Sequence, residues 1–316
     1  MAERSIIDQL DDAISALLAG SDPVANDADR ELVAVARELR GLPSAEFRAA
    51  LKEQLGGKKK MSTAVKAKEF KPEGFHTITP YLTVKPAVEV VEFAKQVFGA
   101  VETFRTTGSA GGLHCEVKIG DSMLMIGGGP TVDPHPAAVH VYVSDVDEVY
   151  ARALQAGATS RWEPADSEYS ERFAAVKDIG GNDWYIEKRV DPIPIPERHT
   201  IAVYFHPIGA PKFIEFLQNA FDAEVVVRHQ SDTGFIYHAK VRVGDSIIEL
   251  GEPHDQWQPM PTSIYMYVED VDASYRQALS AGATSILEPT DQPYGDRNAW
   301  VIDEFGHIWY LSTRLG

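Results

Sequence analysis

Histidine, tyrosine and carboxylate residues recur at alternate positions in three short stretches of the first half of the chain. The pairs are His114 with Glu116, His140 with Tyr142, and Tyr185 with Glu187. Imidazole, phenol and carboxylate groups move protons and hold polar ligands or metal ions. Because neighbouring side chains in a β-strand point to opposite faces, residues two apart share one face. The spacing therefore predicts a polar, aromatic surface that binds a small molecule.

Apolar residues fill the intervening positions, as Val139, Val141 and Val143 do around His140. That alternation predicts strands with one face on helices and the other on a cleft. On the cleft face the first half also offers Met123 and Met125, and the second half offers His238, Lys240, Glu249, Tyr265, Tyr267, Tyr310 and Ser312. Such a face suits a planar or oxygen-rich ligand. We expect the ligand in the cleft of the first half, near His114, His140 and Tyr185.

Two arginines lie in loops rich in turn-forming residues, each three positions after a tyrosine. Arg172 follows Tyr169, and Arg297 follows Tyr294. A guanidinium group here forms either a surface salt bridge or a clamp on an anionic ligand. We include both arginines among the candidate ligand-binding residues.

The chain contains an internal repeat. Val143-Ser-Asp-Val-Asp147 recurs as Val268-Glu-Asp-Val-Asp272, and the same offset of 125 positions relates Ala156-Gly-Ala-Thr-Ser160 to Ala281-Gly-Ala-Thr-Ser285. Earlier residues follow with offsets of 123 or 124, so that His76 corresponds to His199. The sequence therefore indicates a duplication, with modules at 75–192 and 197–316.

Each module shows the same order of local signals twice. A strand-like stretch at 76–84 leads into an amphipathic stretch at 87–98 and then into three extended segments. A second strand at 138–143, an Asp-x-x-Glu helix start at Asp145 and three more extended segments complete the module. Four strand-helix-three-strand units predict an α+β fold in which mixed sheets form cups and helices cover their outer faces.

The N-terminal region differs from the two modules. Residues 1–60 carry leucine, isoleucine and valine at helical spacing and read as a helical segment, and residues 61–74 read as a polar linker. Neither contains a constellation of residues that suggests chemistry, so a role in docking a protein partner stays open for the helical segment.

Composition narrows the classes of partner. The net charge of −17 disfavours nucleic acid and anionic membrane surfaces, which attract basic proteins. The start of the chain lacks the pattern of a signal peptide, and no apolar run is long enough to span a membrane. We therefore expect a cytoplasmic protein whose partner is a small molecule, and both pairing of the modules within the chain and a homo-oligomer are compatible with the sequence.

Several segments resemble PhnB-like members of the vicinal oxygen chelate superfamily, which includes glyoxalases, bleomycin resistance proteins and dioxygenases. The resemblance rests on Lys71-Pro-Glu-Gly-Phe-His-Thr-Ile-Thr-Pro-Tyr-Leu82, Gly120-Asp-Ser-Met-Leu-Met125, Tyr294-Gly-Asp-Arg297 and Asp303-Glu-Phe-Gly-His-Ile-Trp309. It implies tandem modules of paired βαβββ units around a small-molecule site. It does not imply one reaction, because proteins that share this fold differ in chemistry.

The resemblance also implies where a divalent metal is held, namely on the first, fourth, fifth and eighth strands of a module. Those positions carry Thr79, Met125, Ala138 and Tyr185 in the first module and Ala202, Glu249, Ser263 and Tyr310 in the second. Glu249 alone among them is a strong ligand, and combining halves of the two modules does not improve either set. We therefore expect no cofactor and no tightly held metal.

The resulting prediction is a protein that binds or sequesters a small molecule in a cupped sheet. The first alternative is a metal-dependent lyase or dioxygenase with a displaced site centred on His140 and Glu187, and the second is a structural or partner-docking protein. The identity of the ligand and the presence of catalysis do not follow from the sequence.

Overall fold

The computed structural model describes residues 70–108, 111–166, 172–188 and 199–315, and these belong to one compact unit that spans Lys68–Gly316. The predicted helical segment at 1–60 and most of the predicted linker lie outside the described residues. Within the described ranges, no helix is both long enough and apolar enough to cross a membrane.

The predicted strand-helix-three-strand unit occurs four times along the described chain. The first unit comprises β1 (Ile78–Thr83), α4 (Ala87–Phe98), β2 (Val101–Thr107), β3 (Leu113–Ile119) and β4 (Ser122–Gly128). The second comprises β5 (Ala138–Val143), α5 (Val146–Gln155), β6 (Thr159–Ala165), β7 (Phe173–Lys177) and β8 (Asp183–Lys188). The third comprises β9 (Ile201–Phe205), α6 (Ala210–Phe221), β10 (Glu224–Gln230), β11 (Ile236–Val243) and β12 (Ser246–Leu250). The fourth comprises β13 (Ser263–Tyr267), α7 (Val271–Ser280), β14 (Thr284–Asp291), β15 (Asp296–Ile302) and β16 (Ile308–Arg314).

The predicted α+β class and the strand-for-strand correspondence of the modules are confirmed, since the equivalent stretches at 87–98 and 210–221 are both helices.

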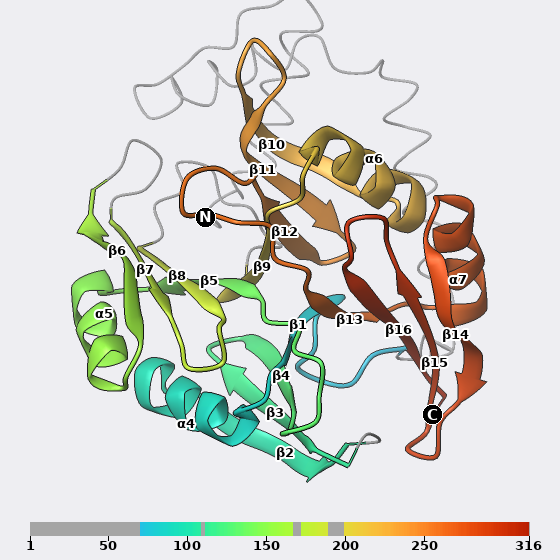
Figure 1. Cartoon of the computed structure of the whole chain (residues 1–316). Coiled ribbons are helices and arrows are strands. Elements are labelled where there is room, and N and C mark those ends of the chain that lie inside the picture. The colour runs from blue at the N-terminus through green and yellow to red at the C-terminus, as the bar shows by residue number, and fades with distance from the viewer. Residues whose placement is uncertain (1–69, 109–110, 167–171, 189–198, 316) are drawn as a thin grey trace, which may run out of the picture. The chain divides into compact units, whose positions relative to one another are not determined.

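The two eight-stranded sheets each combine halves of different modules (Figure 1). Sheet I has the order β14-β15-β16-β13-β1-β4-β3-β2, and sheet II has the order β10-β11-β12-β9-β5-β8-β7-β6. The halves join where β1 runs antiparallel to β13 and where β5 runs antiparallel to β9. A cup on either sheet therefore takes residues from both modules.

The hydrophobic cores follow the modules, in contrast to the sheets. In the first module α4 and α5 cover an apolar cluster that includes Leu82 on β1, Val139 on β5 and Trp184 on β8. In the second module α6 and α7 cover the equivalent cluster around Phe205 and Trp309. Each core thus contains residues of both sheet I and sheet II. The polar face of each sheet points away from the helices.

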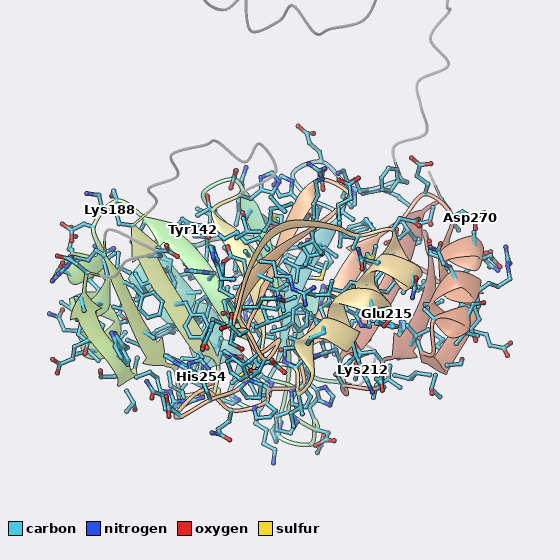
Figure 2. The ribbon with its side chains drawn as sticks, turned by 90° about the horizontal axis from the view of Figure 1, so that it is seen from above. Tyr142, Lys188, Lys212, Glu215, His254 and Asp270 are labelled. Carbon is cyan, nitrogen blue, oxygen red and sulfur yellow. The ribbon has the colours of Figure 1, made fainter. Side chains whose placement is uncertain are left out.

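Local sequence explains where the helices begin and which face they bury. Asp145 and Asp270 cap α5 and α7, because their carboxylates accept the backbone N–H groups of Glu148 and Ala273. On α6 the side chains of Lys212 and Glu215 point to solvent (Figure 2), while the phenylalanines and leucine on its other face are buried.

A buried aspartate holds the turn before the last strand of each module. Asp303 accepts the backbone N–H groups of Phe305 and His307, and its other oxygen accepts Trp309 Nε1–H at 2.9 Å. Asp178 binds Trp184 Nε1–H at the same distance in the first module. Burial raises the pKa of Asp303 to about 6, although these hydrogen bonds oppose the shift.

Candidate functional site

His140 lies at the centre of the polar face of sheet II. It occupies β5, where it pairs with Tyr185 on β8 and with Ala202 on β9. Its side chain is almost fully buried, as are those of Tyr142 on the same strand and Glu249 on β12. Val139 and Val141 belong to the core beneath the helices, which confirms the predicted parity of this strand.

Two carboxylates from different modules flank the His140 ring. Its Nε2 lies 2.5 Å from Glu187 Oε2, and its Nδ1 lies 3.3 Å from Glu249 Oε2. Neither ring nitrogen has hydrogen-bond geometry with any partner in the described ranges, and the same holds for Glu249 Oε2. The other oxygen of Glu249 accepts the hydroxyl of Tyr142. Three buried polar atoms thus take part in ion pairs whose geometry is not that of directed hydrogen bonds.

The electrostatics of this cluster favour a charged histidine. Burial alone would lower the pKa of His140, but Glu249 and Glu187 overcome that effect and raise the pKa to about 10. For Glu249, burial acts to raise the pKa, and the charge of His140 outweighs it and holds the pKa below its usual range. At neutral pH the centre therefore holds an imidazolium ion between two carboxylates.

Further basic groups on β11 approach Glu249. His238 Nε2 lies 3.4 Å from Glu249 Oε2, and Lys240 Nζ lies 3.8 Å from Oε1. Burial lowers the pKa of His238, so this ring is neutral at pH 7. His140 and Lys240 thus supply two positive charges, which balance the two negative charges of Glu187 and Glu249.

Aromatic rings surround the charged centre. Tyr142 stacks on His140 at 4.9 Å between centroids, and Tyr185 and Tyr204 meet it edge-on at 6.0 and 6.2 Å. Trp257, from the segment between β12 and β13, packs edge-on against Tyr185 at 5.2 Å. The surroundings of His140 are therefore aromatic as well as polar, which fits a planar ligand.

Sequence reasoning missed three residues of this site, namely Tyr204, His206 and Trp257. Tyr204 on β9 and His206 just after it alternate with the core residues Val203 and Phe205, so the parity applied to other strands would have found them. Tyr185 and His206 Nε2 share a hydrogen bond of 2.7 Å, and burial lowers the pKa of His206 to about 4. No comparable signal marks Trp257, which lies between strands.

The polar face of sheet I has a different, less charged character. Tyr265 donates to Ser312 at 3.1 Å and accepts from the Asn298 amide at 3.2 Å. On the other half of the sheet the Tyr81 hydroxyl and His114 Nδ1 share a hydrogen bond of 3.0 Å. The remaining predicted residues of this face, Glu116, Met125 and Tyr310, also lie on sheet I.

The expectation that His114, His140 and Tyr185 surround one cleft is wrong. His114 belongs to sheet I, whereas His140 and Tyr185 belong to sheet II, because the modules exchange halves. The sheet II centre instead combines His140, Tyr142, Tyr185 and Glu187 of the first module with His238 and Glu249 of the second.

Arg172 and Arg297 form equivalent surface salt bridges. The Arg172 guanidinium donates to Asp147 at 2.6 and 2.7 Å and to Asp166 at 3.1 Å. Arg297 binds Asp272 and Asp291 in the same way. Of the two alternatives for these arginines, the structure therefore shows the surface salt bridge and not the clamp on an anionic ligand.

The donor atoms around His140 do not fit a divalent metal as they are arranged. His140 directs one nitrogen to Glu187 and the other to Glu249, so the imidazolium itself lies where a cation would separate the carboxylates. Within the described ranges, three histidine or carboxylate groups come within 4.8 Å of one another only at His76, Asp121 and His199, outside this centre.

Comparisons with known proteins agree with this architecture. The model of the Glyoxalase/Bleomycin resistance protein/Dioxygenase superfamily matches residues 209–311. An uncharacterized protein of Mycobacterium tuberculosis is 34% identical over 132 residues, covering 36% of this chain and 78% of that protein. A protein of Mycobacterium bovis is also 34% identical, over 114 residues, covering 33% of this chain and 75% of its own length.

Among solved structures, glyoxalase I from Zea mays has the same fold, with a TM-score of 0.58 and 15% identity. The match covers 74% of this chain and 92% of the maize chain. A putative dioxygenase from Bacillus subtilis matches with a TM-score of 0.53 and 13% identity, and the match covers 75% of this chain and 85% of that chain. The repeat, the paired βαβββ units and these matches agree, and the chain therefore belongs to the glyoxalase/bleomycin resistance protein/dioxygenase superfamily.

Proposed function

We propose that the chain binds a small molecule on the polar face of sheet II and that this centre holds no tightly bound metal. The observation that carries the proposal is the buried charged cluster of His140, Glu187 and Glu249, whose ion pairs lack hydrogen-bond geometry at both ring nitrogens and at Glu249 Oε2. A ligand with donor and acceptor groups would supply the well-directed hydrogen bonds that these three ion-paired atoms lack.

The surroundings favour a planar ligand with both donor and acceptor groups. Tyr185, Tyr204 and Trp257 provide aromatic contact, and the charged groups of His140 and Glu187 provide a donor and an acceptor. Glu187 and Tyr204 are only partly buried, so we expect the ligand to approach His140 from their side. The binding or sequestration predicted from the sequence fits this arrangement.

Two equivalent tyrosines provide a matched test. Tyr204 in sheet II and Tyr81 in sheet I correspond in the repeat, and their hydroxyls lie 3.4 and 3.0 Å from the equivalent histidines His238 and His114. The purified full-length protein is screened against planar heteroaromatic acids and phenols by thermal shift. Affinities of the hits are then measured by calorimetry for the wild type, Tyr204→Phe, Glu187→Gln and Tyr81→Phe.

We expect Tyr204→Phe and Glu187→Gln each to weaken binding about 5- to 30-fold, since one lost hydrogen bond costs about 1–2 kcal/mol. Tyr81→Phe should bind like the wild type. If only Tyr81→Phe weakens binding, the ligand binds on sheet I. If all three variants bind like the wild type, the ligand binds on the polar face of neither sheet.

A metal-dependent lyase or dioxygenase is the second candidate, because Glu249, His140 and Glu187 lie on three of the strands from which the superfamily resemblance implies metal ligands. For this function His140 must lose its proton and turn away from one carboxylate. Metal titration followed by calorimetry decides between the candidates, since stoichiometric binding that His140→Gln abolishes would support the enzyme.

A further inference from the structure

We propose that His76, His199 and Asp121 form a binding site for one divalent transition-metal ion at the junction of the two sheets. His76 precedes β1, His199 precedes β9, and Asp121 lies in the turn between β3 and β4. This junction is separate from the centre at His140, so the inference does not depend on the proposed function.

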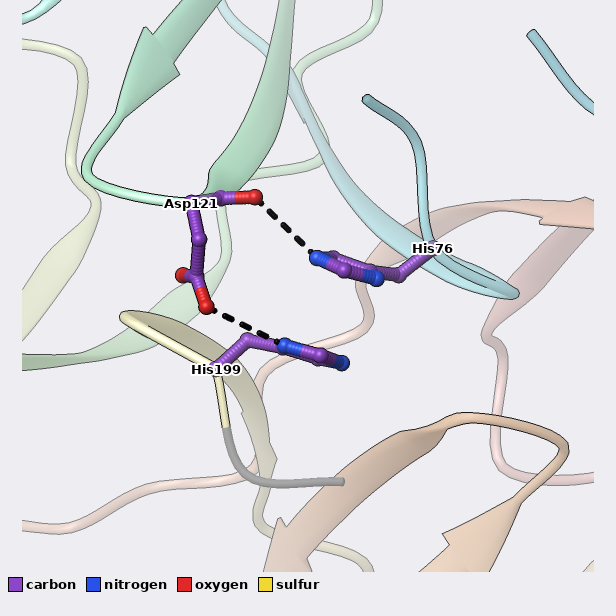
Figure 3. Close-up of side chains that lie close together, drawn as sticks. All are labelled: His76, Asp121 and His199. Atoms are coloured by element: carbon purple, nitrogen blue, oxygen red, sulfur yellow. Dashed lines mark hydrogen bonds and ion pairs between the residues drawn. The ribbon is translucent and has the colours of Figure 1, made fainter. Parts of the chain in front are cut away.

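The three side chains already converge (Figure 3). One donor atom from each lies within 4.8 Å of the other two, and His199 Nδ1 is 3.3 Å from Asp121 Oδ2. The imidazole rings stack with centroids 3.3 Å apart and an angle of 11° between their planes, so one ring turns about its side-chain bonds when both nitrogens bind the same ion. In a tetrahedral zinc site with bonds of about 2.0–2.1 Å, neighbouring ligand atoms lie roughly 3.3 Å apart. The distance of 3.3 Å between His199 Nδ1 and Asp121 Oδ2 matches this spacing.

The donor set has the chemistry of a transition-metal site. Two imidazole nitrogens and one carboxylate oxygen are ligands that Zn²⁺, Co²⁺ and Ni²⁺ accept readily. The Asp121 backbone carbonyl, 3.1 Å from His76 Nε2, lies at the same place. A cavity of about 10 Å³ borders both rings, which is space on the order of one water-sized ligand.

Hydrogen bonds from neighbouring residues fix the position of the Asp121 carboxylate. Its Oδ1 accepts the Thr200 backbone N–H at 2.7 Å and the Ser122 hydroxyl at 3.0 Å, which leaves Oδ2 facing His199. A metal ion would therefore meet a carboxylate whose position is already fixed.

Because of the internal repeat, a second aspartate, Asp245, also lies near the two histidines, but its surroundings are less suited to a metal ion. Asp245 corresponds to Asp121 and lies 3.8 Å from His76 Nδ1, but it also forms an ion pair with Lys71. Among described residues, the only ion-pair partner of Asp121 is His199. The Asp245 carboxylate is thus neutralised by lysine, and the Asp121 carboxylate is available to a cation.

An ion at this place would join the entry to β1 in sheet I to the entry to β9 in sheet II. Thr77 and Thr200, the neighbours of the two histidines, already bind Asp245 and Asp121 across the junction. The site is therefore placed to stabilise the pairing of module halves, and a metal here should raise the melting temperature of the whole unit.

The test uses full-length protein freed of metal with a chelator and then titrated with Co²⁺ and Zn²⁺. Calorimetry gives the stoichiometry and affinity, and the visible absorption of Co²⁺ reports nitrogen and oxygen ligation. The variants are Asp121→Asn and His199→Ala. Asp245→Asn is the matched control, and His140→Gln tests whether metal binds instead in the sheet II centre. Asparagine keeps the oxygen that accepts the backbone N–H, so neither aspartate variant removes that bond.

We expect one ion per chain in the wild type, in Asp245→Asn and in His140→Gln, and at least roughly tenfold weaker binding in Asp121→Asn and His199→Ala. Metal should raise the melting temperature only where it binds. The proposal is overturned if the metal-free wild type binds no ion, if Asp121→Asn and His199→Ala bind as well as the wild type, or if Asp245→Asn weakens binding as much as Asp121→Asn. Loss of binding in His140→Gln alone would place the metal in the sheet II centre and overturn the junction site.

Discussion

His140 carries a positive charge at neutral pH because Glu187 and Glu249 flank it in a buried place. The two carboxylates come from different modules, and Tyr142 binds Glu249 from the same strand as the histidine. Charges removed from water are tolerated when they are paired, and they become costly when one partner is removed. We therefore expect the stability of sheet II to depend on the protonation of His140.

The raised pKa of His140 makes stability depend on pH. The folded-state pKa of about 10 lies above the ordinary value of 6.5, so the contribution is complete below pH 6.5 and is lost as pH rises through 10. We expect the free energy of unfolding in urea to fall by roughly 2–4 kcal/mol between pH 7 and 10, since one pKa unit corresponds to about 1.4 kcal/mol. In His140→Gln most of this dependence should vanish, and an equally steep fall in that variant would contradict the assignment.

Glu249→Gln should be more harmful alone than together with His140→Gln. The single change leaves His140 with one carboxylate and should lower the free energy of unfolding by about 3 kcal/mol. The double variant removes the charge of both partners and should recover at least about 1 kcal/mol of that loss. Urea denaturation of the four proteins in the cycle measures the coupling, and additive effects would show that the two side chains do not interact.

At the scale of elements, the duplication preserves helix starts as well as strands. The N-caps of α5 and α7 are both aspartates with nearly the same backbone angles, Asp145 at φ −136° and Asp270 at φ −138°. Each side chain accepts a backbone N–H three residues on, and the buried aspartates Asp178 and Asp303 repeat in the same way. Local interactions of this kind survive duplication because each needs only a few neighbouring residues.

Removing either helix cap should have the same modest effect. Asp145→Ala and Asp270→Ala each lose one hydrogen bond and a favourable interaction with the helix dipole, which together contribute about 1 kcal/mol. Chemical denaturation should show a similar loss for both variants, with Asp145→Asn close to the wild type as the control. A loss confined to one helix would show that the caps are not equivalent.

At the scale of the whole molecule, the sheets bind the modules together while the cores keep them distinct. β1 pairs with β13 and β5 pairs with β9, so separating the modules would expose two strand edges on each. Exposed edges offer unpaired N–H and C=O groups that favour association. The modules should therefore remain joined even without a covalent connection.

Cleavage between the modules provides a direct test. A protease site introduced within residues 189–198 of the full-length chain would be cut after folding. The fragments should elute together on size exclusion under native conditions and separate in denaturant. Two separate monomers under native conditions would contradict the strand pairing across modules.

The sequence by itself determined the local features of this protein. Alternation placed His140, Glu187, His238 and Glu249 on polar faces, and the repeat predicted four equivalent units, because both depend on residues close together in the chain. The sequence does not determine which strands pair. The two modules have nearly the same pattern of apolar and polar residues, so β5 could pair with a strand of either module. Contacts between residues far apart in sequence decide which strand becomes its partner.

Only the tertiary structure therefore showed that His140 meets Glu249 of the other module, while His114 lies on the other sheet. The cluster of His76, His199 and Asp121 could likewise be found only in the tertiary structure. Its three residues are distant in sequence and meet where the two sheets adjoin.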